Sequence, residues 1–173
     1  FSRADSICNL AAFAGIESTT HRLLESPLPF VPYVEFAEEF AGFRTGRDVK
    51  MRRFQDKGRA ANPAAAVQAR IEVEKFRGPL LIVGGHDDQV WASGMMAQNI
   101  AERRTAAGLA TVALIFPEAG HFLSGNGWMP TTQYNVGLSK SGGTPQANAQ
   151  AQARAYVETI AFLKRTLGVE NSQ

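Results

Sequence analysis

The sequence holds a single cysteine and carries almost no net charge, and each scarcity excludes a class of protein. Cys8 alone cannot form an intramolecular disulfide or a multi-cysteine zinc site. A formal net charge of +2 gives no electrostatic reason to expect nucleic acid or an anionic membrane surface as a partner. No apolar run approaches the roughly 20 residues that span a bilayer. The apolar share, 45%, is that of an ordinary globular chain of one domain or part of one.

The chain also lacks an initiating methionine and the charged-then-apolar layout of a signal peptide. It begins Phe1-Ser2-Arg3, so we expect the natural protein to begin earlier. The sequence indicates no compartment beyond a slight preference for the cytoplasm.

Two short apolar runs, at residues 79–83 and 111–116, have the pattern of buried strands. A helical pattern separates them, and Ser93 is its expected N-cap. Each run ends in a polar turn, so the stretch predicts a β-α-β unit within an α/β fold. Open α/β sheets gather their chemistry at the carboxyl ends of the strands.

Titratable side chains follow both predicted strands. Asp88 is our candidate acid and His121 our candidate base, because a carboxylate can fix the tautomer of a histidine that moves protons. Asp87 is the alternative acid; otherwise we interpret it as a turn residue that binds its own backbone. His86 and His21 lack this strand-end context, so we interpret them as surface or packing residues. The three histidines form no pattern typical of a metal site, and no cofactor is expected.

A nucleophile is the missing part of this pattern. An Asp followed by a His matches the later members of a hydrolase triad, which needs a Ser or Cys earlier, on a G-x-S-x-G elbow. None of the upstream candidates has glycines two residues before and after it; these are Ser2, Ser6, Cys8, Ser18 and Ser26. Ser139 follows the histidine and no clear strand, so it is a weak candidate.

The remaining chain adds helices and an extended loop. Residues 6–14 resemble a buried strand, and three prolines between residues 27 and 32 predict an extended loop. We expect short helices at 34–41 and 47–58. Seven Lys or Arg side chains lie between residues 44 and 59, a set we interpret as a solvated face or an anion-binding lid.

A long helix closes the sequence. Thr144 is its expected N-cap, Pro145 its first residue and Gly168 its end. Its apolar side chains recur at helical spacing, and we expect them to form the packed stripe: Tyr156, Ile160, Leu163 and Leu167.

With these residues in view, the chain resembles the C-terminal part of an α/β-hydrolase of the acyl-CoA thioesterase and bile-acid-CoA:amino-acid N-acyltransferase family, which is dienelactone-hydrolase-like. The resemblance runs from about residue 6 to 167. Its segments are LPFVP at 28–32, IEVEK at 71–75, GPLL at 78–81, GHDDQVW at 85–91, AGH at 119–121 and GGTP at 142–145.

The resemblance implies a parallel sheet flanked by helices, with a lid-like helical insertion at about 26–70 and residues 1–173 forming the C-terminal part of one domain. It implies that Asp88 and His121 complete a triad with a Ser or Cys. That nucleophile would lie before Phe1, in an N-terminal part or a second chain.

The expected function is hydrolysis of acyl thioesters or esters, with a small acyl-CoA or acyl ester as substrate; an amine acceptor would make the protein an acyltransferase. The alternatives are a dienelactone-hydrolase-like carboxylesterase and a non-catalytic binding module with a hydrolase fold.

Overall fold

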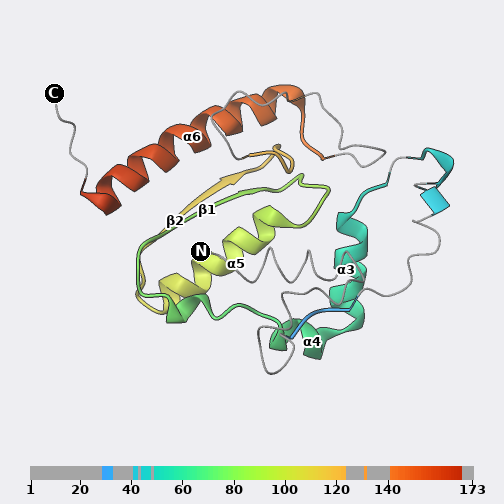
Figure 1. The fold of residues 1–173 in the computed structure, drawn as a ribbon, viewed down its shortest axis with the longest axis horizontal. Helices are drawn as coiled ribbons and strands as arrows, with labels where there is room; N and C mark the ends of the chain where they lie inside the picture. The colour runs from blue at the N-terminus through green and yellow to red at the C-terminus, as the bar shows by residue number, and fades with distance from the viewer. Residues whose placement is uncertain are drawn as a thin grey trace, which may run out of the picture.

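The computed structural model describes residues 29–32, 41–42, 44–47, 49–123, 131 and 141–168. In chain order its elements are α3 (Arg52–Ala61), α4 (Pro63–Gln68), the 3₁₀ turn η2 (Val73–Lys75), β1 (Leu80–Gly85), α5 (Ser93–Ala106), β2 (Thr111–Phe116) and α6 (Pro145–Leu167). They form an α/β structure with one small sheet (Figure 1). The strand predicted at 6–14 lies outside the described residues, as do His21, Ser139 and almost all of the helix predicted at 34–41.

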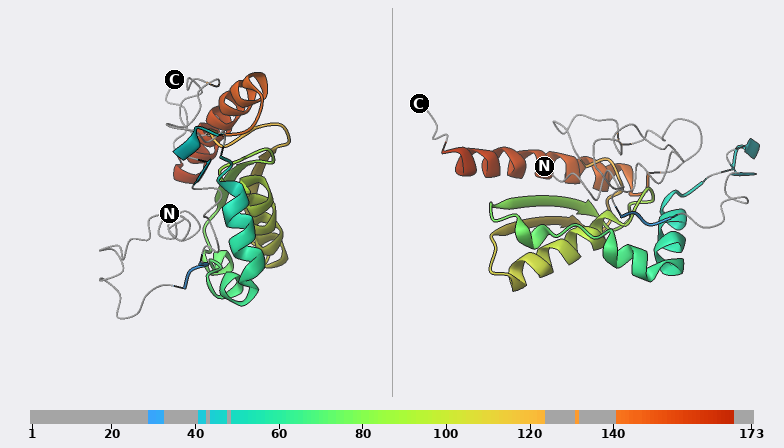
Figure 2. Two further views of the ribbon diagram at one scale, coloured as in Figure 1. Left: turned by 90° about the vertical axis from the view of Figure 1, so that its right-hand side faces the viewer. Right: turned by 60° about the horizontal axis from the view of Figure 1, so that its bottom comes forward.

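The predicted β-α-β unit is present. β1 and β2 pair in parallel, from Leu80 opposite Thr111 to Gly85 opposite Phe116. α5 connects them and packs on one side of the sheet, while α6 crosses the other side (Figures 1 and 2). Because the strands are parallel and in register, both carboxyl ends lie at the same edge, where the loops to α5 and toward α6 begin.

α5 approaches β1 closely at its first turn. A Cβ on Gly84 would lie 2.5 Å from the carbonyl oxygen of Ser93, so only glycine fits there. The N-cap prediction for Ser93 is wrong, because Ala92 is the N-cap and has no side-chain acceptor. The Ser93 hydroxyl instead binds the backbone of Gly85, accepting from its N–H at 3.0 Å and donating to its C=O at 3.2 Å. It joins helix to strand rather than capping the helix.

α3 begins five residues later than the sequence predicted. Val49 and Met51 are buried with Phe54, and Val90 packs against this cluster. The segment before α3 therefore packs against the loop after β1, and the backbone N–H of Arg52 donates to the carbonyl of Gln89 in that loop.

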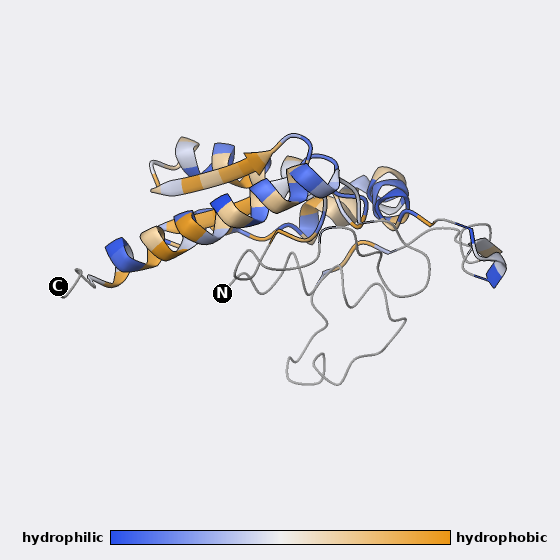
Figure 3. Ribbon diagram, turned by 90° about the horizontal axis from the view of Figure 1, so that it is seen from above, coloured by the Kyte–Doolittle hydropathy of each residue, from blue (hydrophilic) through white to orange (hydrophobic). Residues whose placement is uncertain are grey.

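α6 has the predicted ends. Thr144 caps it by accepting the N–H of Ala147 at 3.1 Å, Pro145 opens it, and Gly168 ends it in the left-handed region at φ 66°. The predicted packed stripe is wrong: its four side chains are 38–70% exposed. The face on the sheet carries Asn148, Ala151, Gln152 and Ala155 instead. The two alanines let the helix lie close to the strands, while the larger apolar residues of α6 are exposed. Figure 3 shows hydrophobic and hydrophilic residues interspersed along α6.

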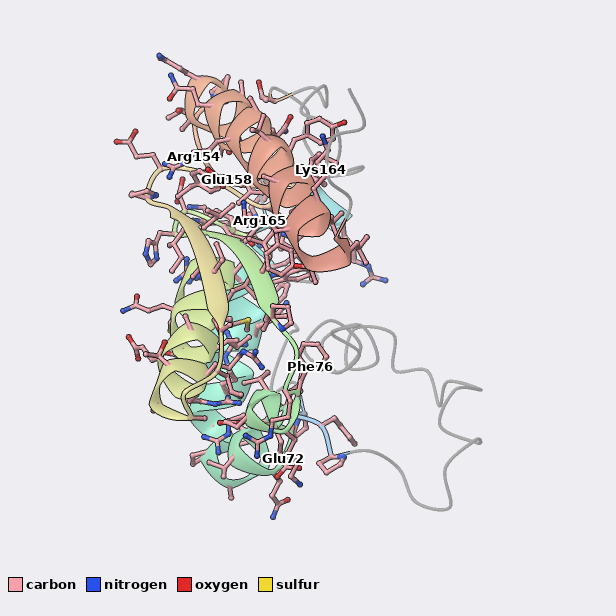
Figure 4. All side chains as sticks on the ribbon, turned by 90° about the vertical axis from the view of Figure 1, so that its left-hand side faces the viewer. Glu72, Phe76, Arg154, Glu158, Lys164 and Arg165 are labelled. Carbon is pink, nitrogen blue, oxygen red and sulfur yellow. The ribbon has the colours of Figure 1, made fainter. Side chains whose placement is uncertain are left out.

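Arg104 is fully buried at the end of α5, with 0% of its surface exposed. Its guanidinium meets no carboxylate among the described residues and lies 5.5 Å from the centroid of the Phe76 ring. Phe76 is labelled in Figure 4. The guanidinium donates instead to the Thr111 hydroxyl and, at 2.6–3.1 Å, to the carbonyls of Val73, Phe76, Gly78 and Ala110. One side chain thus ties η2, the approach to β1 and the approach to β2 together.

The neighbouring Arg103 makes the ordinary kind of ion pair, and this gives a testable pH dependence. Hydrogen bonds from its guanidinium lower the pKa of Glu74 from 4.5 to about 2. Because the folded value lies below the unfolded one, the pair stabilises the fold above about pH 4.5, and this contribution disappears as the pH falls toward 2. We expect Glu74→Gln to be less stable than wild type at pH 7 and the difference to shrink between pH 4.5 and 2, measured by urea denaturation.

The control for this prediction is Glu72→Gln. Glu72 pairs with Lys75 on the surface, with both side chains mostly exposed (Figure 4), so the pair should contribute little. A Glu74 variant whose stability deficit persists unchanged at pH 2 would contradict the assignment.

Candidate active site

Asp88 lies in the loop directly after β1 and is 1% exposed. One carboxylate oxygen, Oδ1, accepts the backbone N–H groups of Val90 at 2.8 Å and Trp91 at 3.1 Å. The other, Oδ2, lies 3.1 Å from Nδ1 of His121. The local turn thus fixes the carboxylate and leaves one oxygen directed at the imidazole.

His121 follows β2 and meets Asp88 across 33 residues of sequence, so the structure brings the two candidate residues together. A carboxylate can only accept hydrogen bonds, which places the imidazole proton on Nδ1 and leaves Nε2 free to accept a proton. The ring of Trp91 packs edge-on at 4.2 Å between centroids, and the His121 side chain is 19% exposed. The imidazole is therefore held in one orientation and still reaches the surface.

Asp87, the alternative acid, points elsewhere. Its Oδ2 accepts the backbone N–H of Gly143 at 2.8 Å, and its Oδ1 accepts from the Gln89 side chain at 2.7 Å. The interpretation of Asp87 as a turn residue bound to its own backbone is wrong, because its partner lies 56 residues further along the chain.

Residues 141–143, here called the strap, bind two loops: the loop after β1 that carries Asp88, here called the acid loop, and the loop after β2 that carries His121, here called the histidine loop. The Ser141 carbonyl accepts two backbone N–H groups, from His121 at 2.9 Å and from Gln89 at 3.2 Å. The strap passes so close that a Cβ on Gly120 would overlap the carbonyl oxygen of Gly142. Gly142 itself has φ 80°, and a Cβ there would overlap the carbonyl oxygen of Asp87. Gly120, directly before His121, therefore allows the histidine loop to pack closely against the strap.

α3 holds the acid loop from the other side. The Arg52 guanidinium donates to the carbonyls of His86 at 2.9 Å and Asp88 at 3.2 Å. The buried Gln55 donates to the Val90 carbonyl at 3.1 Å. These contacts, like the strap, could not be found from sequence because they join side chains to backbone atoms of distant segments.

The other predicted candidates stay apart from this pair. His86 is exposed, as predicted for a surface residue. Within the described residues, no serine, threonine or cysteine side chain binds Nε2 of His121, and no group of three His, Cys, Asp or Glu could hold a metal ion. The helices described here include none long and apolar enough to cross a membrane.

The structure thus holds a carboxylate and a histidine together where the two parallel strands of an α/β structure end. The family model "BAAT / Acyl-CoA thioester hydrolase C terminal" matches residues 27–169, and the chain belongs to this family, as its sequence segments predicted.

Named relatives share this part of the chain. Mouse acyl-coenzyme A thioesterase 6 is 32% identical over 108 residues, covering 60% of this chain and 26% of that protein. The human protein of the same name is 31% identical over 110 residues, covering 61% and 26%. Mouse peroxisomal succinyl-coenzyme A thioesterase is 28% identical over 109 residues, covering 60% and 26%. The chain thus spans about a quarter of the length of the curated relatives it matches.

Proposed function

We propose that this chain carries the acid and base of an enzyme that hydrolyses acyl-CoA thioesters, with Asp88 orienting His121. The observation that carries the proposal is the 3.1 Å contact between Asp88 Oδ2 and His121 Nδ1, made by a buried carboxylate whose other oxygen already accepts two N–H groups. The relatives' names supply the thioester.

The chemistry follows from the free Nε2. A nucleophilic Ser or Cys attacks the acyl carbonyl while Nε2 of His121 takes its proton. The same nitrogen returns that proton to the departing CoA sulfur, which leaves an acyl-enzyme. His121 then activates water to release the acid. Asp88 holds the imidazole and stabilises its protonated form throughout.

We place the nucleophile outside this chain, on an elbow in an N-terminal part of the same domain or on a second polypeptide. Residues 1–173 then form the C-terminal part of a hydrolase domain, with residues 26–70 as a lid. The mass of the purified protein under native and denaturing conditions tests this assignment. A species of 18.7 kDa without a partner polypeptide would leave His121 nothing to activate and would overturn it.

The substrate is tested through the basic segment before and within α3. The Arg52 guanidinium donates to the Asp88 carbonyl and so fixes the start of α3 beside the acid loop. Lys50 and Arg53, which lie on either side of Arg52 in the sequence, are exposed. A CoA thioester carries phosphates that these cations can bind. The double variant Lys50→Gln/Arg53→Gln should raise KM for an acyl-CoA by about tenfold, since exposed cations contribute up to about 1 kcal/mol each to an ion pair and about 1.4 kcal/mol in total is tenfold. KM for an acyl ester without phosphates should not change.

The matched control is Arg154→Gln/Arg165→Gln, which removes two exposed cations from α6 (Figure 4). It should leave both KM values unchanged. Equal effects of the α3 variant on both substrates would favour a carboxylesterase over a thioesterase.

A further inference from the structure

Two amide side chains on the buried face of α6 lie beside the candidate histidine. Asn148 is 3% exposed and Gln152 is 1% exposed, and they stand one helical turn apart on the same face as Ala151 and Ala155. An alanine-rich helix face needs no amides to pack against a sheet. The sequence-based prediction did not include these amides; the pattern that marks them is a pair of polar residues at i and i+4 within an alanine-rich helix face.

Their hydrogen bonds hold the backbone on both sides of His121. Asn148 Oδ1 accepts the N–H of Gly120 at 2.7 Å, and Gln152 donates to the carbonyl of Phe122 at 3.0 Å. The other end of the Asn148 amide donates to the carbonyl of Gly142 in the strap at 3.1 Å. With the N–H of His121 bound to the strap, three consecutive residues of the histidine loop are fixed.

We propose that Asn148 and Gln152 are positioning residues that set the place of His121 against Asp88. This inference rests on the proposed function for its catalytic consequence and on the hydrogen bonds for its geometry. Because side chains on one rigid helix hold Gly120 and Phe122, α6 fixes where the Cα of His121 lies. The imidazole then meets Asp88 at 3.1 Å without further adjustment.

The Oε1 atom of Gln152 makes it possible to distinguish a positioning role from a packing role. Its Oε1 is buried and has no hydrogen-bond partner in the described part of the chain. A buried unsatisfied acceptor destabilises a fold. Methionine has nearly the same shape and lacks this atom, but it also takes the donor away from the Phe122 carbonyl. The two effects oppose each other, so Gln152→Met should keep a melting temperature close to that of the wild type. Lost activity at an unchanged melting temperature would separate the hold on Phe122 from a contribution to stability.

The test uses the intact enzyme and follows His121 directly, by the Nδ1–H proton resonance in NMR, together with kcat, KM and Tm. Gln152→Met and Asn148→Leu should shift or broaden that resonance and lower kcat by about 10- to 100-fold, with KM within about threefold. Gln150→Met, an exposed position on the same helix, is the control and should change none of these. Gln152→Met keeps the test decisive where Asn148→Leu fails to fold.

Each result supports or overturns the positioning role of Asn148 and Gln152. Folded variants with the wild-type resonance would overturn the positioning role, whether or not Tm or kcat falls. An altered resonance with lowered kcat supports it. An altered resonance in an enzyme whose wild type hydrolyses no thioester also supports it, while showing that the proposed function has failed on separate grounds.

Discussion

Replacing His121 by glutamine in the intact enzyme is expected to lower kcat by about 10⁴- to 10⁶-fold, with KM for the acyl-CoA little changed. In the proposed mechanism this side chain takes the nucleophile's proton and returns it to the leaving sulfur, and triad members of this kind contribute effects of that size. Asp88→Asn should cost about 10⁴-fold, because an amide that donates to Nδ1 favours the wrong tautomer.

Steady-state kinetics on a saturating acyl-CoA check this expectation. His86→Gln, an exposed histidine on the same loop as Asp88, is the matched control and should retain wild-type kcat. If His121→Gln kept more than a tenth of the activity, the triad assignment would be wrong, and a module that binds without catalysis would be the better account.

Arg104→Met is expected to have the largest effect on stability, a loss of about 3–5 kcal/mol, because it leaves buried carbonyls without their donor. The guanidinium donates to four carbonyls in a site with 0% exposure, and methionine would fill the volume while leaving them unsatisfied. Each unsatisfied buried carbonyl costs about 1–3 kcal/mol unless the backbone relaxes or water enters. Arg104→Lys should lose less, since it keeps the charge and up to three donors.

Urea denaturation at pH 7 measures this loss. Arg103→Met is the control one position away: its side chain is partly exposed and pairs with Glu74, so its loss should stay near 1 kcal/mol. A loss below 1 kcal/mol for Arg104→Met would show that the four carbonyls find water or other donors, and that Arg104 is not what joins η2 to the sheet.

The sequence carried the parts of this fold that depend on local pattern. Two apolar runs, a helix and polar strand ends were enough to predict the parallel pair and the meeting of Asp88 with His121. Thr144 and Gly168 likewise marked the ends of α6, because capping uses residues within a few positions of each other.

What the sequence could not supply are contacts whose partner is a backbone atom far along the chain. Asp87 binds Gly143, Arg52 binds His86, and Asn148 binds Gly120, and no side-chain pattern marks a carbonyl or an N–H as a partner. The α6 stripe failed for another reason: apolar periodicity finds the larger apolar side chains, whereas the buried face of this helix carries two alanines and two amides.

The shared carbonyl of Ser141 has a consequence for how activity is lost. Because one oxygen accepts the N–H of both Gln89 and His121, opening of the strap takes one hydrogen bond from the acid loop and one from the histidine loop in the same event. Such segments open as a cooperative unit. A partly weakened strap therefore gives two populations, one with both loops held and one in which Asp88 and His121 are held less firmly against each other, rather than a uniform enzyme with a slightly longer hydrogen bond. Destabilised variants would lose active molecules while the remaining ones turn over at the wild-type rate.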